Sequence, residues 1–257
     1  MAKIIAISNQ KGGVGKTTTA VNLAACLGAL GKKTLLVDAD PQGNATSGVA
    51  VDKSKVKYST YSILVDEVKA QQCVVTTPYQ NLHIIPSSLD LAAAELEIAE
   101  KSRREALLKN ALLPIKQYYD YIIIDCPPSL GLITTNALTV ADTFLVPIQC
   151  EYYALEGLSQ LMNTVRRIKR QYNESIDIEG VLLTMYDGRL NLTQQVVDEV
   201  KKFFPRKVFK TVIPRGVRLS EAPSFGEAII SYDKFSKGAH AYKALAKEVI
   251  KKNNKEN

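Results

Sequence analysis

The chain has 257 residues, of which 46% are hydrophobic and 23% charged, and this composition supports a packed core and excludes a disordered or collagen-like protein. Its four cysteines lie far apart without a Cys-x-x-Cys pair, so neither a zinc site nor a disulfide framework is indicated. The net charge of +7 comes from the C-terminal part of the chain: residues 201–257 carry 14 Lys and Arg against 5 Asp and Glu, whereas residues 1–200 carry 19 against 21. This excess of basic residues fits either a solvated surface or a patch that binds nucleic acid or anionic lipid.

Short apolar, β-branched runs alternate along the chain with longer segments of helical period. The runs predict strands at Ile4–Ser8, Thr34–Asp38, Leu82–Pro86, Tyr121–Asp125, Phe144–Ile148, Gly180–Tyr186 and Val208–Pro214. The periodic segments predict helices at Thr17–Leu30, Asp90–Tyr118, Gly131–Ala141, Ala154–Tyr172, Leu192–Phe204 and Ala239–Lys251. Several runs are apolar throughout, which is typical of strands covered on both faces. The order predicts a doubly wound, mostly parallel α/β sheet with helices on both faces.

One domain accounts for residues 1–257, because no linker, low-complexity segment or internal repeat interrupts the alternation. Residues 51–80 are polar and irregular, and we expect them to form an insertion over the ligand edge of the sheet. Residues 252–257 are expected to form a polar tail.

A glycine-rich segment follows the first predicted strand and reads Gln10-Lys11-Gly12-Gly13-Val14-Gly15-Lys16-Thr17-Thr18. Glycines let successive backbone N–H groups point at phosphate oxygens, and the helix that begins near Lys16 adds its positive end. The Lys16 ammonium is placed to reach the β- and γ-phosphates, and the Thr17 hydroxyl to complete a Mg²⁺ shell. The segment predicts a phosphate-binding loop, whose nucleotide-binding residues are Lys11, Gly12, Gly13, Val14, Gly15, Lys16, Thr17 and Thr18.

Two other predicted strands end in carboxylates. The second strand runs into Asp38-Ala39-Asp40-Pro41-Gln42, and a carboxylate at this edge can orient an attacking water or bind the metal shell. Asp38 is equally well a structural cap, and we leave it outside the catalytic set. The strand Tyr121–Asp125 has four apolar residues before its aspartate, which is the Walker B pattern, in which Asp125 holds Mg²⁺ through water.

The order Lys-Gly-Gly-Val-Gly-Lys-Thr-Thr departs from the ordinary phosphate loop, since Gln10 stands where its first glycine would be. It resembles the deviant Walker A loop of partition and division-site ATPases and of the nitrogenase iron protein. The resemblance implies that Lys11 crosses the interface of an ATP-sandwich dimer to the partner's nucleotide, so Lys11 joins Lys16 as a catalytic residue. It also implies that Asp40, in switch I, positions the hydrolytic water, and that Cys126-Pro127-Pro128-Ser129 is switch II.

The resemblance extends from Lys3 to Lys252 and is strongest to the chromosomal ParA/Soj partition ATPases, through residues 151–157 and 212–226. It implies that Pro214 and Gly216 contact the adenine. Asn is usual where Gly216 stands, so a backbone contact could survive there and a side-chain contact could not. It further implies that Arg189 and Arg218 bind DNA.

The function implied is that of a Mg²⁺-dependent ATP hydrolase which dimerises on ATP and binds double-stranded DNA non-specifically. A ParB-type centromere-binding protein would stimulate it during chromosome or plasmid segregation. We expect a cytoplasmic protein, nucleoid-associated when ATP-bound and without a membrane partner, because no apolar run approaches the ~18 residues of a membrane span.

Two alternatives use the same scaffold. A MinD-like division-site ATPase would end in a membrane-binding helix, whereas the stripe of Tyr242, Leu245 and Val249 is typical of a helix packed on the core. An iron–sulfur reductase would need cluster ligands, which the spacing of the cysteines does not offer.

Overall fold

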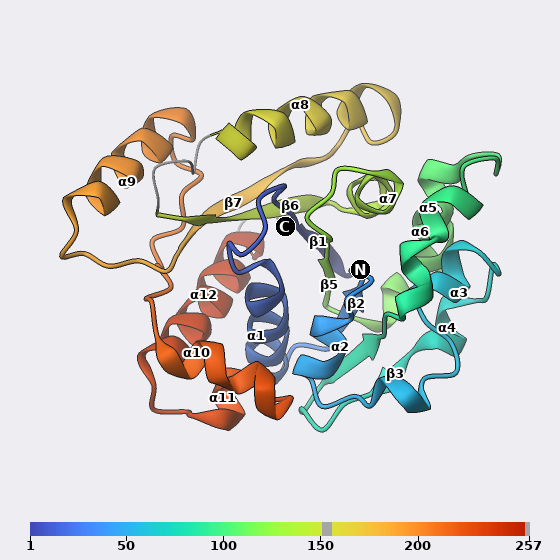
Figure 1. Ribbon diagram of the computed structural model, residues 1–257, viewed down its shortest axis with the longest axis horizontal. Helices are drawn as coiled ribbons and strands as arrows, with labels where there is room; N and C mark the ends of the chain where they lie inside the picture. The colour runs from blue at the N-terminus through green and yellow to red at the C-terminus, as the bar shows by residue number, and fades with distance from the viewer. Residues whose placement is uncertain (151–155, 255–257) are drawn as a thin grey trace.

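The computed structural model describes residues 1–150 and 156–254, and its centre is a sheet of seven strands with helices on both faces (Figure 1). The strand order is β3-β4-β2-β5-β1-β6-β7. All neighbouring strands are parallel except the edge pair β3 and β4. The strands are β1 Lys3–Ile7, β2 Thr34–Asp38, β3 Val75–Thr76, β4 Leu82–Ile85, β5 Tyr121–Asp125, β6 Thr143–Gln149 and β7 Asp177–Thr184. The predicted doubly wound, mostly parallel sheet is confirmed.

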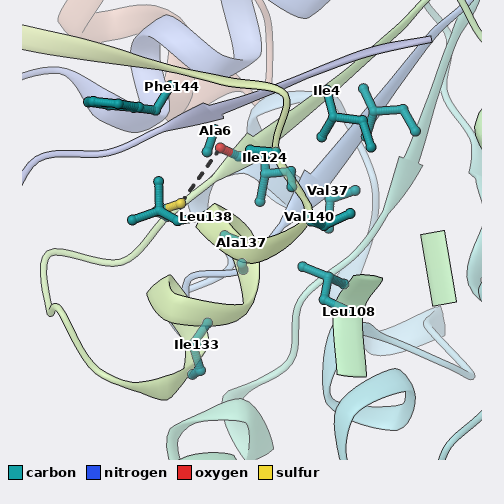
Figure 2. Close-up of a cluster of buried hydrophobic side chains, with 14 of the residues drawn as sticks. Ile4, Ala6, Val37, Leu108, Ile124, Ile133, Ala137, Leu138, Val140 and Phe144 are labelled. Carbon is teal, nitrogen blue, oxygen red and sulfur yellow. Dashed lines mark hydrogen bonds between the residues drawn. The ribbon is translucent and has the colours of Figure 1, made fainter. Parts of the chain in front are cut away.

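The central strands are buried on both faces because their side chains alternate between two apolar clusters. Ile4 of β1 lies in one cluster with Leu108 and Leu138, which come from the helices on that face (Figure 2). Its neighbour Ile5 lies in the second cluster with Leu23, from the helices on the opposite face. A strand that is covered on both faces has apolar residues at successive positions, so it is visible in the sequence as a continuous hydrophobic run. This is why the sequence predicted these strands close to their observed positions.

Five longer helices lie close to their predicted positions. They are α1 Lys16–Ala29, α7 Leu132–Val140, α8 Glu156–Gln171, α9 Asn191–Phe203 and α12 Lys237–Asn253. Shorter helices are α2 Asn44–Gly48, α10 Val217–Glu221, η6 Ala222–Phe225 and α11 Ile229–Tyr232. The first residues of the helix predicted from Ala154, most of the 151–157 motif and residues 255–257 of the expected tail lie outside the described residues.

The single helix predicted over Asp90–Tyr118 is wrong. The segment forms five short pieces instead: η2 Leu89–Ala92, α5 Ala94–Glu97, η3 Arg104–Ala106, α6 Leu107–Leu112 and η4 Leu113–Tyr118. Arg103 adopts a left-handed φ of 53°, which ends helical geometry there. The buried side chain of Asn136 in α7 then accepts a hydrogen bond from Leu108 N at 3.1 Å and donates one to Arg104 O at 2.7 Å. These contacts satisfy backbone groups that a continuous helix would pair internally.

The strand predicted at Val208–Pro214 is also wrong as a regular element. This segment runs beside β7 and bonds to it at separate points, with one isolated bridge to Val181 of β7 from Val208 and another between Pro214 and Tyr186, just beyond the end of β7. The ladder breaks in between because Lys210 N and Thr211 N donate to the Glu248 carboxylate on α12, at 2.8 and 3.0 Å. The sheet nevertheless has seven strands, because β3 forms within residues 51–80, the segment expected to be irregular.

Residues 51–80 contain several short elements: η1 Lys53–Lys55, α3 Thr60–Leu64, α4 Ala70–Cys73 and β3. Their contacts reach the end of β2, since the Thr60 hydroxyl donates to Asp38 O at 2.7 Å. On the other side of the sheet, α12 packs against α1 and buries the stripe of Tyr242, Leu245 and Val249, as predicted. Within the described part of the chain, no helix combines the length and hydropathy needed to cross a bilayer.

Candidate active site

The carboxyl ends of three neighbouring strands meet where the glycine-rich loop begins. Asp38 at the end of β2 is in register with Asp125 at the end of β5, and Ile7 at the end of β1 is the register partner of Asp125 on its other side. Backbone hydrogen bonds continue past the strands, from Ala39 N to Asp125 O and from Cys126 N to Ile7 O. Parallel pairing therefore places both aspartates beside the loop that joins β1 to α1.

The loop is shaped as an open cradle. Gly13 and Gly15 have φ values of 73° and 85°, a left-handed conformation that residues with a Cβ disfavour. A Cβ built at Gly12 or Gly13 would meet no atom within 4 Å, so the loop faces open space where phosphate oxygens can approach the backbone. Gly15 precedes the first turn of α1, whose N–H groups point the same way.

Two residues outside the glycine motif hold the loop in place. The buried amide of Asn9 donates to Pro147 O of β6 at 2.7 Å and accepts from Lys11 N at 3.0 Å. The Thr184 hydroxyl at the end of β7 donates to Val14 O at 2.9 Å. Sequence reasoning missed both. Asn9 could have been found by its position directly before the loop, whereas Thr184 lies 170 residues away and carries no motif.

Lys16 points back over the loop. Its ammonium donates to Lys11 O at 3.1 Å, and the side chain is only 7% exposed. Burial lowers the pKa of Lys16, while the charge of the nearby Asp125 acts in the opposite direction. A phosphate group in the cradle would replace the single carbonyl with a full negative charge, which a buried ammonium binds strongly.

Asp125 is a fully buried carboxylate, and among the described residues neither of its oxygens has a hydrogen-bond partner. Burial raises its pKa well above the ordinary range, the charge of Asp38 adds to this effect, and the nearby Thr17 hydroxyl opposes it. Such a group is costly to a folded protein unless a cation or donor binds it. Its environment therefore indicates a ligand site.

The two aspartates of the β2 end have different surroundings. Asp38 is fully buried and accepts hydrogen bonds from Thr46 N, Thr46 Oγ1 and Asp40 N, so it organises the loop and the first turn of α2. Burial raises the pKa of Asp38 despite these donors. Asp40 is 9% exposed, and among the contacts described its carboxylate accepts a single hydrogen bond, from Gln42 N at 2.9 Å. These contacts agree with the structural role that the sequence left open for Asp38.

The described residues fit Mg²⁺ bound together with a nucleotide. They contain no group of three or more His, Cys, Asp or Glu side chains able to hold a metal alone. Mg²⁺ is usually held by one or two carboxylates, waters and substrate phosphates, so a single orphaned carboxylate beside a phosphate cradle matches its needs. Asp125 and the half-buried Thr17 at the start of α1 are the side chains in position.

A cavity of about 510 Å³ adjoins the cradle, within the size range of ligand pockets. Gly15 and Thr18 of the loop line one side, and Pro214 and Gly216 line another. The structure thus brings the residues predicted to contact the adenine together with those predicted to bind phosphates. No atom lies within 4 Å of a Cβ built at Gly216, so a side chain there would meet open space. Sequence reasoning did not place Leu219, Pro223 or Tyr242 on this wall.

The two arginines predicted to bind DNA lie at the surface, away from the cradle. The Arg189 side chain is 88% exposed and donates two hydrogen bonds to Asp187, which lower the pKa of that carboxyl to about 2. Arg218 is 59% exposed and pairs with Glu221 at 3.0 Å. Surface ion pairs of this kind are worth little to folding, so these contacts leave both guanidinium groups available to a stronger anion.

Comparison with known proteins places this geometry in a family. The family model described as "AAA domain" matches residues 2–178. The sporulation initiation inhibitor protein Soj of Bacillus subtilis is 61% identical over 249 residues, which cover 97% of this chain and 98% of that protein. The chromosome partitioning protein ParA of Myxococcus xanthus is 51% identical over 252 residues, covering 98% of this chain and 89% of that protein.

A solved structure has the same architecture and carries a nucleotide. The cobyrinic acid a,c-diamide synthase of Mycobacterium smegmatis, crystallised with bound ADP and magnesium, superposes with a TM-score of 0.84 at 35% identity and covers 96% of this chain and 93% of that one. The identities to Soj and ParA are far higher and span nearly the whole chain. From its phosphate loop, its strand-end aspartates and this similarity, the chain belongs to the Soj/ParA family of chromosome-partitioning P-loop ATPases.

Proposed function

We propose that this protein hydrolyses ATP with Mg²⁺, forms an ATP-sandwich homodimer, binds double-stranded DNA non-specifically and, stimulated by a ParB-type partner, drives chromosome or plasmid segregation. The observation that carries the catalytic part is the buried Asp125 carboxylate, which has no hydrogen-bond partner in the part of the chain that the structure describes and lies beside an open phosphate cradle. The relative from Mycobacterium smegmatis with bound ADP and magnesium supports nucleotide and metal binding on this scaffold.

Binding of the nucleotide rests on the loop and the adjoining cavity. Backbone N–H groups of Gly12 to Thr18 and the Lys16 ammonium bind the phosphates, and the base enters the cavity between the loop and Pro214. Thr17 and, through water, Asp125 hold Mg²⁺, which neutralises charge on the phosphate oxygens when it is bound. Asn9 and Thr184 keep the cradle in shape before the ligand arrives.

Hydrolysis is an in-line attack of water on the γ-phosphate, for which the protein supplies position and charge. Asp40 holds the water, since its carboxylate lies at the same sheet edge and has only one donor among the contacts described. Lys16 compensates the negative charge that builds up on the transferred group. The Lys11 of a second copy adds a further cation, which makes turnover depend on dimer formation.

DNA binding follows from the charge distribution. The basic excess of residues 201–257 and the exposed Arg189 and Arg218 can neutralise phosphates and release counterions without reading bases. A two-fold dimer presents two such surfaces at once, so avidity couples DNA binding to ATP. The membrane alternative has less support, because the apolar face of α12 is buried.

The test is ATPase activity of the whole protein with and without DNA and the cognate ParB-type partner, together with gel filtration in ATP. We expect slow hydrolysis alone, stimulation by the two partners together and an ATP-dependent dimer. Absence of hydrolysis under all four conditions would overturn the proposal. ATP-dependent sedimentation with anionic vesicles, and not with DNA, would favour the division-site alternative.

Lys16→Ala is the matched loss-of-binding variant. It removes the charge that compensates the phosphates, so the ATP-dependent dimer should disappear on gel filtration. Lys69→Ala, which removes an exposed lysine next to α4, serves as the control and should dimerise normally. An undiminished dimer of Lys16→Ala would count against the assignment of the loop.

A further inference from the structure

α5 lies between the segments that follow the two aspartate-bearing strands. On one side, the Tyr61 hydroxyl of α3 donates to the Glu97 carboxylate of α5 at 2.8 Å. The same helix α3 begins at Thr60, whose hydroxyl is bonded to the carbonyl of Asp38 at the end of β2. α5 is therefore anchored to the sheet edge that carries the site.

On its other side, α5 caps the start of α7. The carboxylate of Glu95 accepts a hydrogen bond from Ile133 N at 3.3 Å, and a Cβ added at Gly131 would collide with both of its oxygens. Gly131 is the N-cap position of α7 and supplies no capping side chain of its own. A carboxylate at a helix N-terminus satisfies an otherwise unpaired N–H and is favoured by the helix dipole. Here it comes from a residue 38 positions earlier in the chain.

α7 in turn holds the segment that leaves Asp125. Residues 126–131 connect Asp125 to the start of α7, and the Thr134 hydroxyl in the first turn of that helix donates to Ser129 O at 2.6 Å. This connection is short, so a shift at the N-terminus of α7 is transmitted to the backbone next to Asp125. None of these contacts involves the phosphate loop.

We propose that Glu95 is a positioning residue for hydrolysis, which acts by capping α7 and thereby holding residues 126–129 in place beside Asp125. Its kinetic consequence rests on the proposed ATPase function. Because Glu95 touches neither the cradle nor the base cavity, it acts on the rate of hydrolysis and leaves nucleotide binding unchanged. In this role the hydrogen bond accepted by the Glu95 side-chain oxygen matters more than the negative charge of the carboxylate.

Glu95→Ala should lower kcat about fivefold with KM for ATP unchanged, the factor that corresponds to a capping interaction of about 1 kcal/mol. Glu95→Gln keeps an acceptor oxygen and should stay within about twofold of the unaltered protein. Glu100→Ala, which removes an exposed carboxylate from the same segment, is the matched control and should not change kcat. Equal loss in Glu95→Gln and Glu95→Ala, or a normal kcat in Glu95→Ala, would overturn the proposal.

A second measurement does not depend on turnover. Amide hydrogen exchange of residues 131–135 in the nucleotide-free protein should be faster in Glu95→Ala by about the same factor, and unchanged in Glu100→Ala. Gly131→Ala displaces the carboxylate and should reproduce the effect, with no further loss when both substitutions are combined. Unchanged exchange in Glu95→Ala would overturn the capping role, whether or not the protein hydrolyses ATP. If the unaltered protein does not hydrolyse ATP but the variants show the expected exchange pattern, only the proposed ATPase function is overturned.

Discussion

At the scale of single residues, the buried carboxylates of Asp125 and Asp38 destabilise the ligand-free site, and a bound cation would relieve this. Their register pairing brings two acids together in the interior. Burial raises both pKa values, and the charge of Asp38 adds to the effect on Asp125. Thr46 and a backbone amide compensate Asp38, whereas residues 1–150 and 156–254 provide no hydrogen-bond partner for Asp125. The free energy that this burial costs is recovered when a cation binds.

Asp125→Asn should stabilise the nucleotide-free protein at pH 7 by about 1–3 kcal/mol, because it removes a buried charge that has no hydrogen-bond partner among the described residues. The native pKa of Asp125 is raised above its unfolded value, so the native state holds the proton more tightly and the free energy of unfolding falls as pH rises through the native pKa. The gain should therefore shrink at pH 5, where more of the unaltered Asp125 is protonated. Urea denaturation at both pH values measures this.

The control for that experiment is Asp66→Asn, which neutralises an exposed carboxylate and should leave the free energy of unfolding within about 0.5 kcal/mol of that of the unaltered protein. A stability gain in Asp125→Asn that does not depend on pH would show that charge burial is not its cause.

Asp40→Ala should uncouple binding from hydrolysis. The substitution removes the group that orients water and leaves the cradle intact, so we expect turnover to fall by about 100-fold or more with an ATP-locked dimer held on DNA. Single-turnover hydrolysis and gel filtration in ATP measure the two effects. Asp52→Ala, at an exposed carboxylate before η1, should behave as the unaltered protein, and near-normal hydrolysis in Asp40→Ala would remove Asp40 from the mechanism.

At the scale of elements, the segment 208–214 shows how one helix reshapes another part of the site. Glu248 on α12 accepts hydrogen bonds from Lys210 N, Thr211 N and Thr211 Oγ1, all between 2.8 and 3.0 Å. These bonds replace a regular ladder with β7. They also fix the path of the segment to Pro214, which lines the cavity next to the phosphate loop. A helix that packs on α1 thus positions the loop that we propose to contact the nucleotide.

Glu248→Ala should lower the free energy of unfolding by about 1–3 kcal/mol, since it leaves donors without their charged acceptor. We also expect weaker binding of ADP in titration calorimetry, because Pro214 loses its support. Lys247→Ala alters the exposed neighbour on the same helix and should change neither quantity. Unaltered stability together with unaltered ADP affinity would show that the segment keeps its path without Glu248.

At the scale of the whole molecule, α9, which follows Arg189, and α10, which contains Arg218, lie on one side of the view, whereas α4 and α5 lie on the opposite side (Figure 1). Arg189 pairs with Asp187 in its own loop, and Arg218 pairs with Glu221 on α10 and with Asp233 after α11, so both are held in defined positions without being buried. Preorganised, exposed guanidinium groups suit phosphate contacts, which depend on charge and geometry and carry no sequence information.

Arg189→Ala and Arg218→Ala should each weaken DNA binding to all sequences alike and reduce the slope of log affinity against log salt by about one for each phosphate that is no longer neutralised. Dimer formation and nucleotide binding should survive in both. Lys69→Ala removes a cation from the distant α4 region and should leave the salt slope unchanged. A double arginine variant that binds DNA with the original salt slope would exclude this surface.

The amino-acid sequence by itself determined the strands that are apolar on both faces, the phosphate loop and the aspartates that end β2 and β5. These are local patterns, in which residue type and spacing carry the physics. It could not determine that Asn136 breaks the helix predicted over residues 90–118, or that Glu248 breaks the strand predicted over residues 208–214. In both cases a side chain from a distant element takes over the backbone hydrogen bonds, and such competition is decided only when tertiary packing brings the groups together. For the same reason only the folded chain shows that the described residues give Asp125 no hydrogen-bond partner and that Thr184 supports the loop.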